Sequence, residues 1–331
     1  MTFFEKLTAA MQQNNSLLCI GLDSDFEKIP ECLKKKTRGD NTPPPDGRPL
    51  SRGDYSSRQR AEIILAFNRA IIDATKDAVC AYKPNSAFYE ALGGRGLEIL
   101  KQTIQYIRER APAIPVILDA KRGDIGSTNA SYVQFAFSYL KADAITLHPY
   151  LGREALQPFL DQKEKGIFVL CRTSNPGAGE FQDLKVFRFQ GHSDPANAGE
   201  ESPTNVDRHA PETLRHTQGD TNGEELYKVV SRQVAEEWNA NGNCGLVVGA
   251  TYPEELREVR TIVGNMPILV PGIGTQGGDV EKTVRAGITA QGNSIIVNSS
   301  RGIIFASSDE DFAEAAKIEV LKLRDQINQY R

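Results

Sequence analysis

Four charged side chains lie close together in the middle of the sequence: Asp119, Lys121, Arg122 and Asp124. They follow the apolar run Val116–Leu118, which favours a short buried strand. In an extended chain, residues two apart point to the same side, so Asp119 and Lys121 are expected to project together. Nearby carboxylates keep an amine protonated, so the pattern predicts a proton donor in an active site. The alternative is a solvated loop with a chance salt bridge.

These residues need a scaffold, and the sequence supplies a regular one. Near-continuous apolar runs, typical of buried strands, alternate with segments of helical periodicity. Eight such strands favour a single-domain (β/α)₈ TIM barrel, with a doubly wound open sheet as the alternative. The expected strands are Leu17–Leu22, Val79–Lys83, Ile114–Leu118, Asp143–Leu147, Gly166–Cys171, Gly245–Val248, Pro267–Val270 and Ser294–Val297.

The barrel interpretation makes a prediction about chemistry, because active sites of such barrels lie at the carboxyl ends of the strands. Several of the expected strands of this sequence are followed by ionisable or hydroxyl side chains. We therefore expect these groups to converge on one site. They are Asp23, Lys83, Asp119 with Lys121, His148, Ser174, Thr251 and Arg301.

Two segments near the end of the sequence have the composition of a phosphate-binding site. Pro271–Gly278 reads PGIGTQGG and Ser299–Gly302 reads SSRG. Backbone N–H groups at glycines such as Gly272 and Gly274 can approach an anion closely, and Arg301 can add a bidentate contact. The alternative is that the glycines only turn the chain. The first interpretation predicts a phosphorylated small molecule as substrate.

The sequence contains no evident nucleophile with an adjacent base, and no Rossmann or P-loop fingerprint. With the charged cluster in view, the expected reaction is proton chemistry with electrostatic stabilisation of an anion.

Two polar segments interrupt the alternating pattern, at Thr37–Arg60 and Phe187–Asn222. Both are poor in apolar residues, and we expect them to be exposed, mobile insertions. Three of the four histidines, His192, His209 and His216, fall in the second segment. Their spacing fits no familiar metal site, so we expect no metal there.

Composition narrows the class of protein. A net charge of −4 over 331 residues gives no overall positive potential that would attract nucleic acid or a membrane surface. No apolar run approaches the roughly 18 residues of a membrane helix, and the first residues lack an apolar signal core. We expect a cytoplasmic enzyme, with Cys19, Cys80, Cys171 and Cys244 as reduced core residues.

At the level of motifs, the sequence resembles the orotidine 5′-phosphate decarboxylase family in its longer bacterial, type 2 form. The resemblance covers nearly all of the chain except the two polar segments. The D-x-K-x-x-D pattern is shared by a wider suprafamily, but its combination with YKPN and PGIGTQGG is narrower. The motifs are GLDSD (21–25), AYKPNSAFYE (81–90), LDAKRGDIGSTN (118–129), RTSNPGAGEFQ (172–182), PGIGTQGG (271–278) and SSRGI (299–303).

The resemblance implies decarboxylation of orotidine 5′-monophosphate to uridine 5′-monophosphate in pyrimidine biosynthesis, without metal or organic cofactor. It implies a homodimer in which Lys83, Asp119 and Lys121 of one subunit meet Asp124 of the other, and Lys121 protonates C6 of the pyrimidine. The resemblance also implies the substrate contacts. Asp23 and Lys83 contact the ribose, together with Thr128 from the partner subunit. Ser174 contacts the pyrimidine, Gln276 lies between the pyrimidine and the phosphate, and Arg301 binds the phosphate.

Two other functions remain open at this point. One is another phosphate-binding barrel enzyme, such as a sugar-phosphate decarboxylase or epimerase. Members of this suprafamily that stabilise an enediolate use a metal, so sensitivity to a chelator would favour that alternative. The other is a catalytically silent nucleotide-binding protein, which would bind without turnover.

Overall fold

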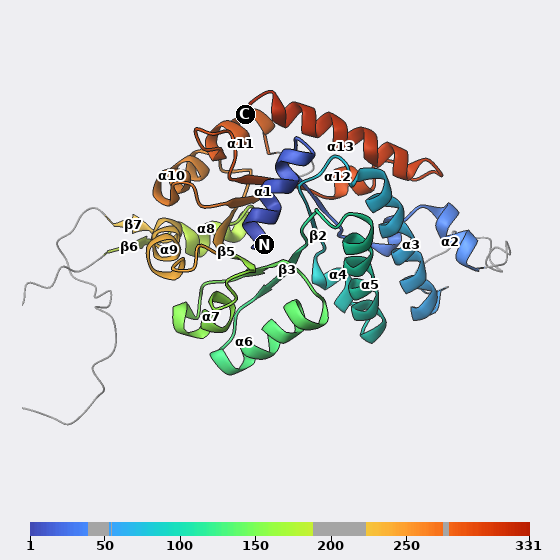
Figure 1. Ribbon diagram of the computed structural model, residues 1–331, viewed down its shortest axis with the longest axis horizontal. Helices are drawn as coiled ribbons and strands as arrows, with labels where there is room; N and C mark the ends of the chain where they lie inside the picture. Colours follow the sequence, from blue (N-terminus) through green and yellow to red (C-terminus); the bar gives the residue numbers. More distant parts are fainter. Residues whose placement is uncertain (39–52, 54, 188–222, 274–277) are drawn as a thin grey trace, which may run out of the picture.

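The computed structural model describes residues 1–38, 53, 55–187, 223–273 and 278–331 (Figure 1). Eight parallel strands form one sheet, and all eight overlap the apolar runs of the sequence, although β3 begins at Ile117 and extends past Leu118 to Arg122. Their bounds are β1 Leu18–Gly21, β2 Ala81–Lys83, β3 Ile117–Arg122, β4 Ala144–Leu147, β5 Gly166–Arg172, β8 Cys244–Val248, β9 Ile268–Pro271 and β10 Ile295–Ser299.

The sheet curls into a nearly closed barrel. Its strand order is β2-β1-β10-β9-β8-β5-β4-β3, and β2 and β3 at its two ends are linked by the bridges Tyr82–Val116 and Asn85–Asp119. The amide of Asp119 donates to the carbonyl of Pro84 across this seam, at 3.0 Å. The predicted (β/α)₈ barrel is therefore confirmed, and the open sheet is excluded.

Helices surround the barrel, as Figure 1 shows. Short 3₁₀ turns at Phe26–Lys28 and Pro176–Ala178 and π-helical turns at Gln134–Tyr139 and Val234–Trp238 adjoin them. The helices are α1 Phe3–Gln13, α2 Glu31–Arg38, α3 Ser57–Thr75, α4 Ser86–Glu90, α5 Gly94–Arg110, α6 Gly126–Val133, α7 Gly152–Leu160, α8 Gly179–Gln182, α9 Leu226–Gln233, α10 Pro253–Val263, α11 Val280–Gly287, α12 Arg301–Ile304 and α13 Phe312–Asn328.

The amino-terminal end of the barrel is covered by α1. This helix begins with a capping box, in which Thr2 and Glu5 satisfy each other's backbone N–H groups. Phe3 packs edge-on against Phe168 of β5, with ring centroids 5.7 Å apart. Gly166 is required here, because a Cβ at that position would lie 2.3 Å from the Phe3 ring. α1 thus covers the amino end of the barrel, and the carboxyl end remains open for a functional site.

The described residues move one edge of the first predicted polar insertion and flank the second with a short ribbon. α3 begins at Ser57, so the predicted end of the first insertion at Arg60 was late, and Tyr55 is buried against Phe26. A two-stranded antiparallel ribbon, β6 Lys185–Val186 with β7 Glu224–Glu225, joins the flanks of the second insertion. The predicted exposure and mobility of residues 39–52 and 188–222 lie outside the described residues.

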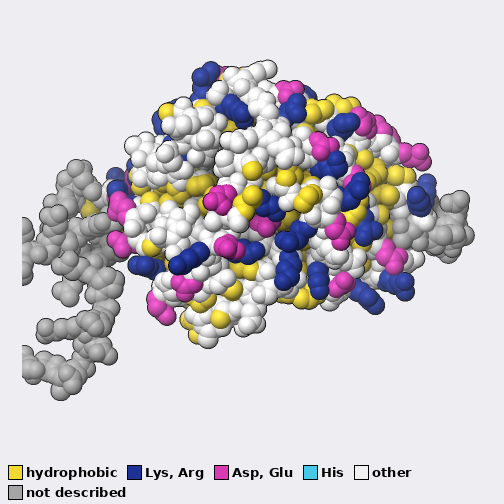
Figure 2. Space-filling model, in the orientation of Figure 1, with side chains coloured by type: hydrophobic (Ala, Val, Ile, Leu, Met, Phe, Trp, Pro, Cys, Tyr) yellow, Lys and Arg dark blue, Asp and Glu magenta, His cyan; other side chains and the backbone are white. Residues whose placement is uncertain are grey.

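The surface carries charges of both signs. Figure 2 shows Lys and Arg side chains intermingled with Asp and Glu over the face that it presents. Within the described part of the chain, no helix is long and apolar enough to cross a membrane. The cysteines predicted to lie in the core are buried and free, as expected.

Candidate active site

Three charged side chains meet at the carboxyl ends of β2 and β3. Asp119 Oδ2 accepts a hydrogen bond from Lys83 Nζ at 2.7 Å, and Asp119 Oδ1 accepts one from Lys121 Nζ at 2.6 Å. The side chains of Lys83 and Asp119 are 4% and 9% exposed, whereas that of Lys121 is 48% exposed. Lys83 is therefore a fixed buried charge, and Lys121 can reach a bound molecule.

The predicted contact between Asp119 and Lys121 is present, but regular strand alternation is not its cause. The pairing of β3 with β4 shifts between Leu118 and Arg122, and Lys121 has φ of +46°, in the left-handed region. A β-bulge re-aims the side chains of its strand. The bulge, rather than a two-residue repeat, brings the lysine back over the carboxylate.

Electrostatic interactions keep Asp119 and Lys83 ionised. Burial alone would raise the pKa of the Asp119 carboxyl, but the two lysine ammonium groups outweigh it and hold that pKa well below its usual range. Burial would likewise lower the pKa of Lys83, and the carboxylates of Asp119 and Asp23 raise it above its usual value instead. Below the site, burial raises the pKa of the Cys19 thiol to about 12, so it stays protonated at neutral pH.

These residues open into a cavity of about 450 Å³ at the carboxyl end of the barrel. Seven of the residues predicted from strand ends and glycine-rich loops line it together. They are Asp23, Lys83, Asp119, Lys121, Ser174, Gly272 and Arg301.

Asp23 occupies one side of this cavity, after β1. Ser300 Oγ donates to Asp23 Oδ2 at 2.8 Å and approaches the carbonyl oxygen of Gly21 at 3.0 Å. The other carboxylate oxygen, Asp23 Oδ1, is buried and accepts no hydrogen bond from a described residue. A buried acceptor of this kind, at the wall of a cavity, is suited to a ligand hydroxyl.

The predicted phosphate end is described in part. Arg301 is exposed at the cavity wall and forms no ion pair with another described residue. Gly272 has φ of +104°, a conformation that a side chain would strain. Gly274 and Gln276 lie outside the described residues.

Four predicted residues are not part of this chain's cavity. Asp124 and Thr128 do not line it. The Asp124 carboxylate instead accepts a hydrogen bond from the amide of Ile125 at 2.7 Å. His148 and Thr251, which also follow strands, do not line it either; the His148 ring bonds the carbonyl of Gly123 at 2.8 Å.

Several lining residues were not singled out from the sequence. Thr146, from β4, bonds both Asp119 and Lys121. Gln182 holds the loop that carries Ser174, because its side-chain oxygen accepts from the amide of Thr173 at 2.8 Å. Gln182 lies in the motif RTSNPGAGEFQ, so the motif was a usable signal for it. For Thr146, a hydroxyl inside an apolar strand was the only signal.

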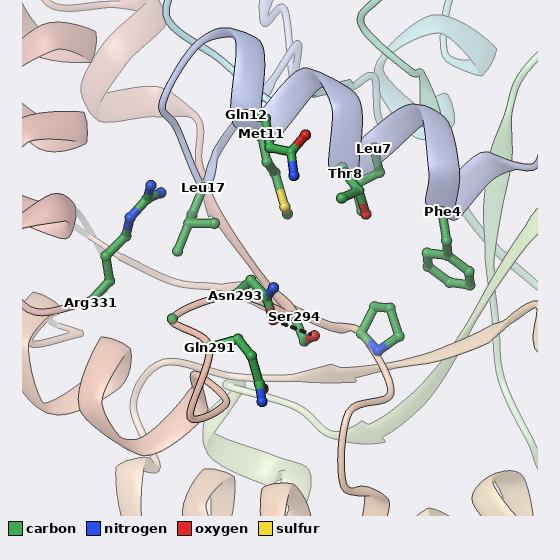
Figure 3. A pocket seen from close by; sticks show the side chains of 12 residues that line it. Phe4, Leu7, Thr8, Met11, Gln12, Leu17, Gln291, Asn293, Ser294 and Arg331 are labelled. Carbon is green, nitrogen blue, oxygen red and sulfur yellow. Dashed lines mark hydrogen bonds between the residues drawn. The ribbon is translucent and has the colours of Figure 1, made fainter.

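A second cavity, of about 230 Å³, lies at the opposite end of the barrel (Figure 3). α1 forms one wall through Phe4, Leu7 and Met11, and the loop before β10 forms another. Within the described residues, no cluster of three or more His, Cys, Asp or Glu side chains could hold a metal ion.

Comparison with known proteins agrees with this geometry. The sequence model of the orotidine 5′-phosphate decarboxylase / HUMPS family matches residues 16–198 and 209–317. The chain belongs to this family.

Individual relatives within it point the same way. Orotidine 5′-phosphate decarboxylase of Ralstonia nicotianae is 45% identical over 331 residues, covering 100% of both chains. The enzyme of that name from Azoarcus is 44% identical, with the same coverage. The structure of Leishmania donovani OMP decarboxylase superimposes with a TM-score of 0.68 at 32% identity, over 98% of this chain and 99% of that one. The resemblance seen in the motifs is confirmed.

Proposed function

We propose that this chain decarboxylates orotidine 5′-monophosphate to uridine 5′-monophosphate and CO₂, in pyrimidine biosynthesis, with Lys121 as the acid. The family and the relatives support this carboxy-lyase activity. The observation that carries the proposed mechanism is the contact of Lys121 Nζ with buried Asp119 inside the cavity at the carboxyl end of the barrel.

The chemical step has a simple balance. The bond between C6 of the pyrimidine and its carboxylate breaks, and the electron pair of that bond remains at C6 as CO₂ leaves. Lys121 donates a proton to C6, which gives the product and a neutral amine. Because Lys121 is about half exposed, solvent can restore its proton after product release. Asp119 lies beside the departing carboxylate, and its Oδ1 holds the Lys121 ammonium while its Oδ2 is bound by Lys83.

The rest of the cavity binds the nucleotide. Asp23, through its free Oδ1, and Lys83 contact the ribose hydroxyls, and Ser174 contacts the pyrimidine edge. Arg301, Gln276 and the backbone of Gly272 and Gly274 bind the phosphate. Binding energy from this remote group holds the ring against Lys121, so it contributes to the chemical step as well as to affinity. No metal or organic cofactor takes part.

The active form is a homodimer with shared sites, in which Asp124 and Thr128 of the partner subunit complete each cavity. Three apolar side chains beside Asp124 and at the start of α7 support an interface here: Ile125, Tyr150 and Leu151 are 58%, 88% and 43% exposed. The partner subunit would cover these side chains in the proposed dimer, since contiguous exposed apolar patches mark contact surfaces in soluble proteins. Pyrimidine biosynthesis supports a cytoplasmic location.

One incubation tests the activity. Purified protein is treated with EDTA, desalted and mixed with orotidine 5′-monophosphate, and uridine 5′-monophosphate is followed by chromatography. We expect stoichiometric conversion with no added metal. Activity that disappears with the chelator would favour a metal-dependent enzyme of the wider suprafamily. Nucleotide binding without any product would favour a silent binding protein.

A further inference from the structure

The bulge in β3 interrupts the regular backbone hydrogen bonding between β3 and β4. Ile117 and Leu118 pair with Ala144 and Ile145, and the next partner of β4 is Arg122, opposite Leu147. Asp119, Ala120 and Lys121 therefore have only one residue of β4, Thr146, across from them. The amide of Lys121 has no strand partner here, and a buried amide without a hydrogen bond is costly.

The side chain of Thr146 supplies the missing hydrogen-bond acceptor for this amide. Its Oγ1 accepts a hydrogen bond from the amide of Lys121 at 3.0 Å and donates one to Asp119 Oδ1 at 2.9 Å. The direction of both bonds is fixed, because an ionised carboxylate only accepts and an amide only donates. Thr146 is 1% exposed, so no solvent competes for the hydroxyl.

We infer that Thr146 is a positioning residue for the proton transfer, acting through Lys121 and Asp119 at once. Lys121 has a left-handed backbone conformation that non-glycine residues rarely adopt, and such conformations persist only where the surroundings hold them. The hydroxyl holds the lysine backbone on one side and the carboxylate that aims its ammonium on the other. This inference rests on the proposed function, in which Lys121 is the acid.

Two substitutions separate positioning from packing. Thr146→Val keeps the shape of the side chain but removes the hydroxyl, whereas Thr146→Ser keeps the hydroxyl but removes a methyl group. If Thr146 only fills space, the serine variant is the more damaged of the two. If the hydroxyl positions Lys121 and Asp119, the serine variant retains activity and the valine variant loses it.

The experiment measures kcat and KM of wild type and both variants with orotidine 5′-monophosphate, with folding checked by circular dichroism. For Thr146→Val we expect kcat to fall roughly 10–100-fold, the scale of a hydrogen bond to a charged group, with KM changed less than about threefold. Thr146→Ser should recover kcat to within about threefold of wild type.

Each outcome has one reading. Equal kcat for wild type and Thr146→Val, or a serine variant as slow as the valine variant, overturns the positioning role while the decarboxylase activity stands. A rise in KM alone assigns Thr146 to binding and also overturns it. Wild-type protein that makes no uridine 5′-monophosphate overturns the proposed function, and this inference with it.

Discussion

The two ends of this barrel carry cavities of very different chemistry. The cavity at the carboxyl ends of the strands, about 450 Å³, is lined by Asp23, Lys83, Asp119 and Lys121. The cavity at the amino ends, about 230 Å³, is walled by α1, and Arg331 is the one ionisable side chain among the described residues that line it (Figure 3). The same eight strands build both, so the difference lies in which residues follow and which precede each strand.

This contrast indicates that the carboxyl end of the barrel serves the reaction and the amino end serves stability. Residues that follow a barrel strand lie on loops that can vary without disturbing the core, which is why barrel enzymes use that end for chemistry. At the amino end, α1 packs apolar side chains over the strands and closes the core. Substitutions in the cavity at the carboxyl end should therefore change turnover, and substitutions in the cavity at the amino end should change stability alone.

The largest difference is expected for Lys121→Ala. Removing the proton donor should lower kcat on the order of 10⁴-fold, while uridine 5′-monophosphate still binds through Arg301 and Gln276. Steady-state turnover and isothermal titration calorimetry with the product measure the two effects. Near-normal turnover would remove Lys121 from the mechanism.

Asp119→Asn should reduce stability as well as turnover, because it leaves Lys83 buried without its main counter-charge. We expect a loss of about 3–5 kcal/mol in the free energy of unfolding at neutral pH. The depressed pKa of Asp119 stabilises the fold above the unfolded-state pKa of about 4, and this contribution is lost as pH falls through the folded-state pKa.

Urea unfolding of wild type and the asparagine variant between acid and neutral pH checks this prediction. Wild type should lose stability steeply in acid, and the variant less so, since it has no carboxyl at that position. Parallel curves for the two proteins would mean that the pKa of Asp119 is not perturbed in the folded state.

Arg301→Ala should have a smaller effect, because it removes one charged contact far from the reacting carbon. We expect kcat/KM for orotidine 5′-monophosphate to fall roughly 10–100-fold. The phosphate-free nucleoside orotidine is the control and should be indifferent to the change. A nucleoside that suffers equally would show that Arg301 has a structural role.

Met11→Ala, in the cavity at the amino end, should leave activity almost unchanged. Truncating this buried side chain should cost about 2–5 kcal/mol of stability, while kcat/KM of the folded protein stays within about twofold of wild type. Thermal unfolding and turnover at a temperature well below the midpoint measure the two quantities. A large loss of turnover in folded protein would break the proposed division between the two ends.

The barrel, and several residues that line the cavity at its carboxyl end, could be predicted from the sequence because both depend on local patterns. Near-continuous apolar runs marked all eight strands, and the residues directly after them supplied Asp23, Lys83, Asp119 and Arg301. Short elements were missed, among them α4, α8, α12 and the β6–β7 ribbon, since they contain too few residues to show a period.

The remaining details depend on contacts between distant parts of the chain. Ser300 bonds Asp23 across 277 positions of sequence, and Thr146 faces Lys121 only because β3 bulges opposite β4. A bulge has no reliable signature in a single sequence, and the register that sets it arises when the strands pair. Residues that act through others are therefore the hardest to foresee.

The central claim is that a complete site at the carboxyl end takes Lys121 from one subunit and Asp124 from its partner. In a two-fold dimer of Lys121→Ala with Asp124→Ala chains, one site receives both defects and the other receives neither. The two inactive homodimers are unfolded, mixed in equal amounts and refolded, and turnover of orotidine 5′-monophosphate is measured. Random pairing makes about half of the dimers mixed, with half of their sites whole, so activity should recover to roughly a quarter of wild type. No recovery, from a mixture shown by mass spectrometry to contain mixed dimers, would contradict the shared site.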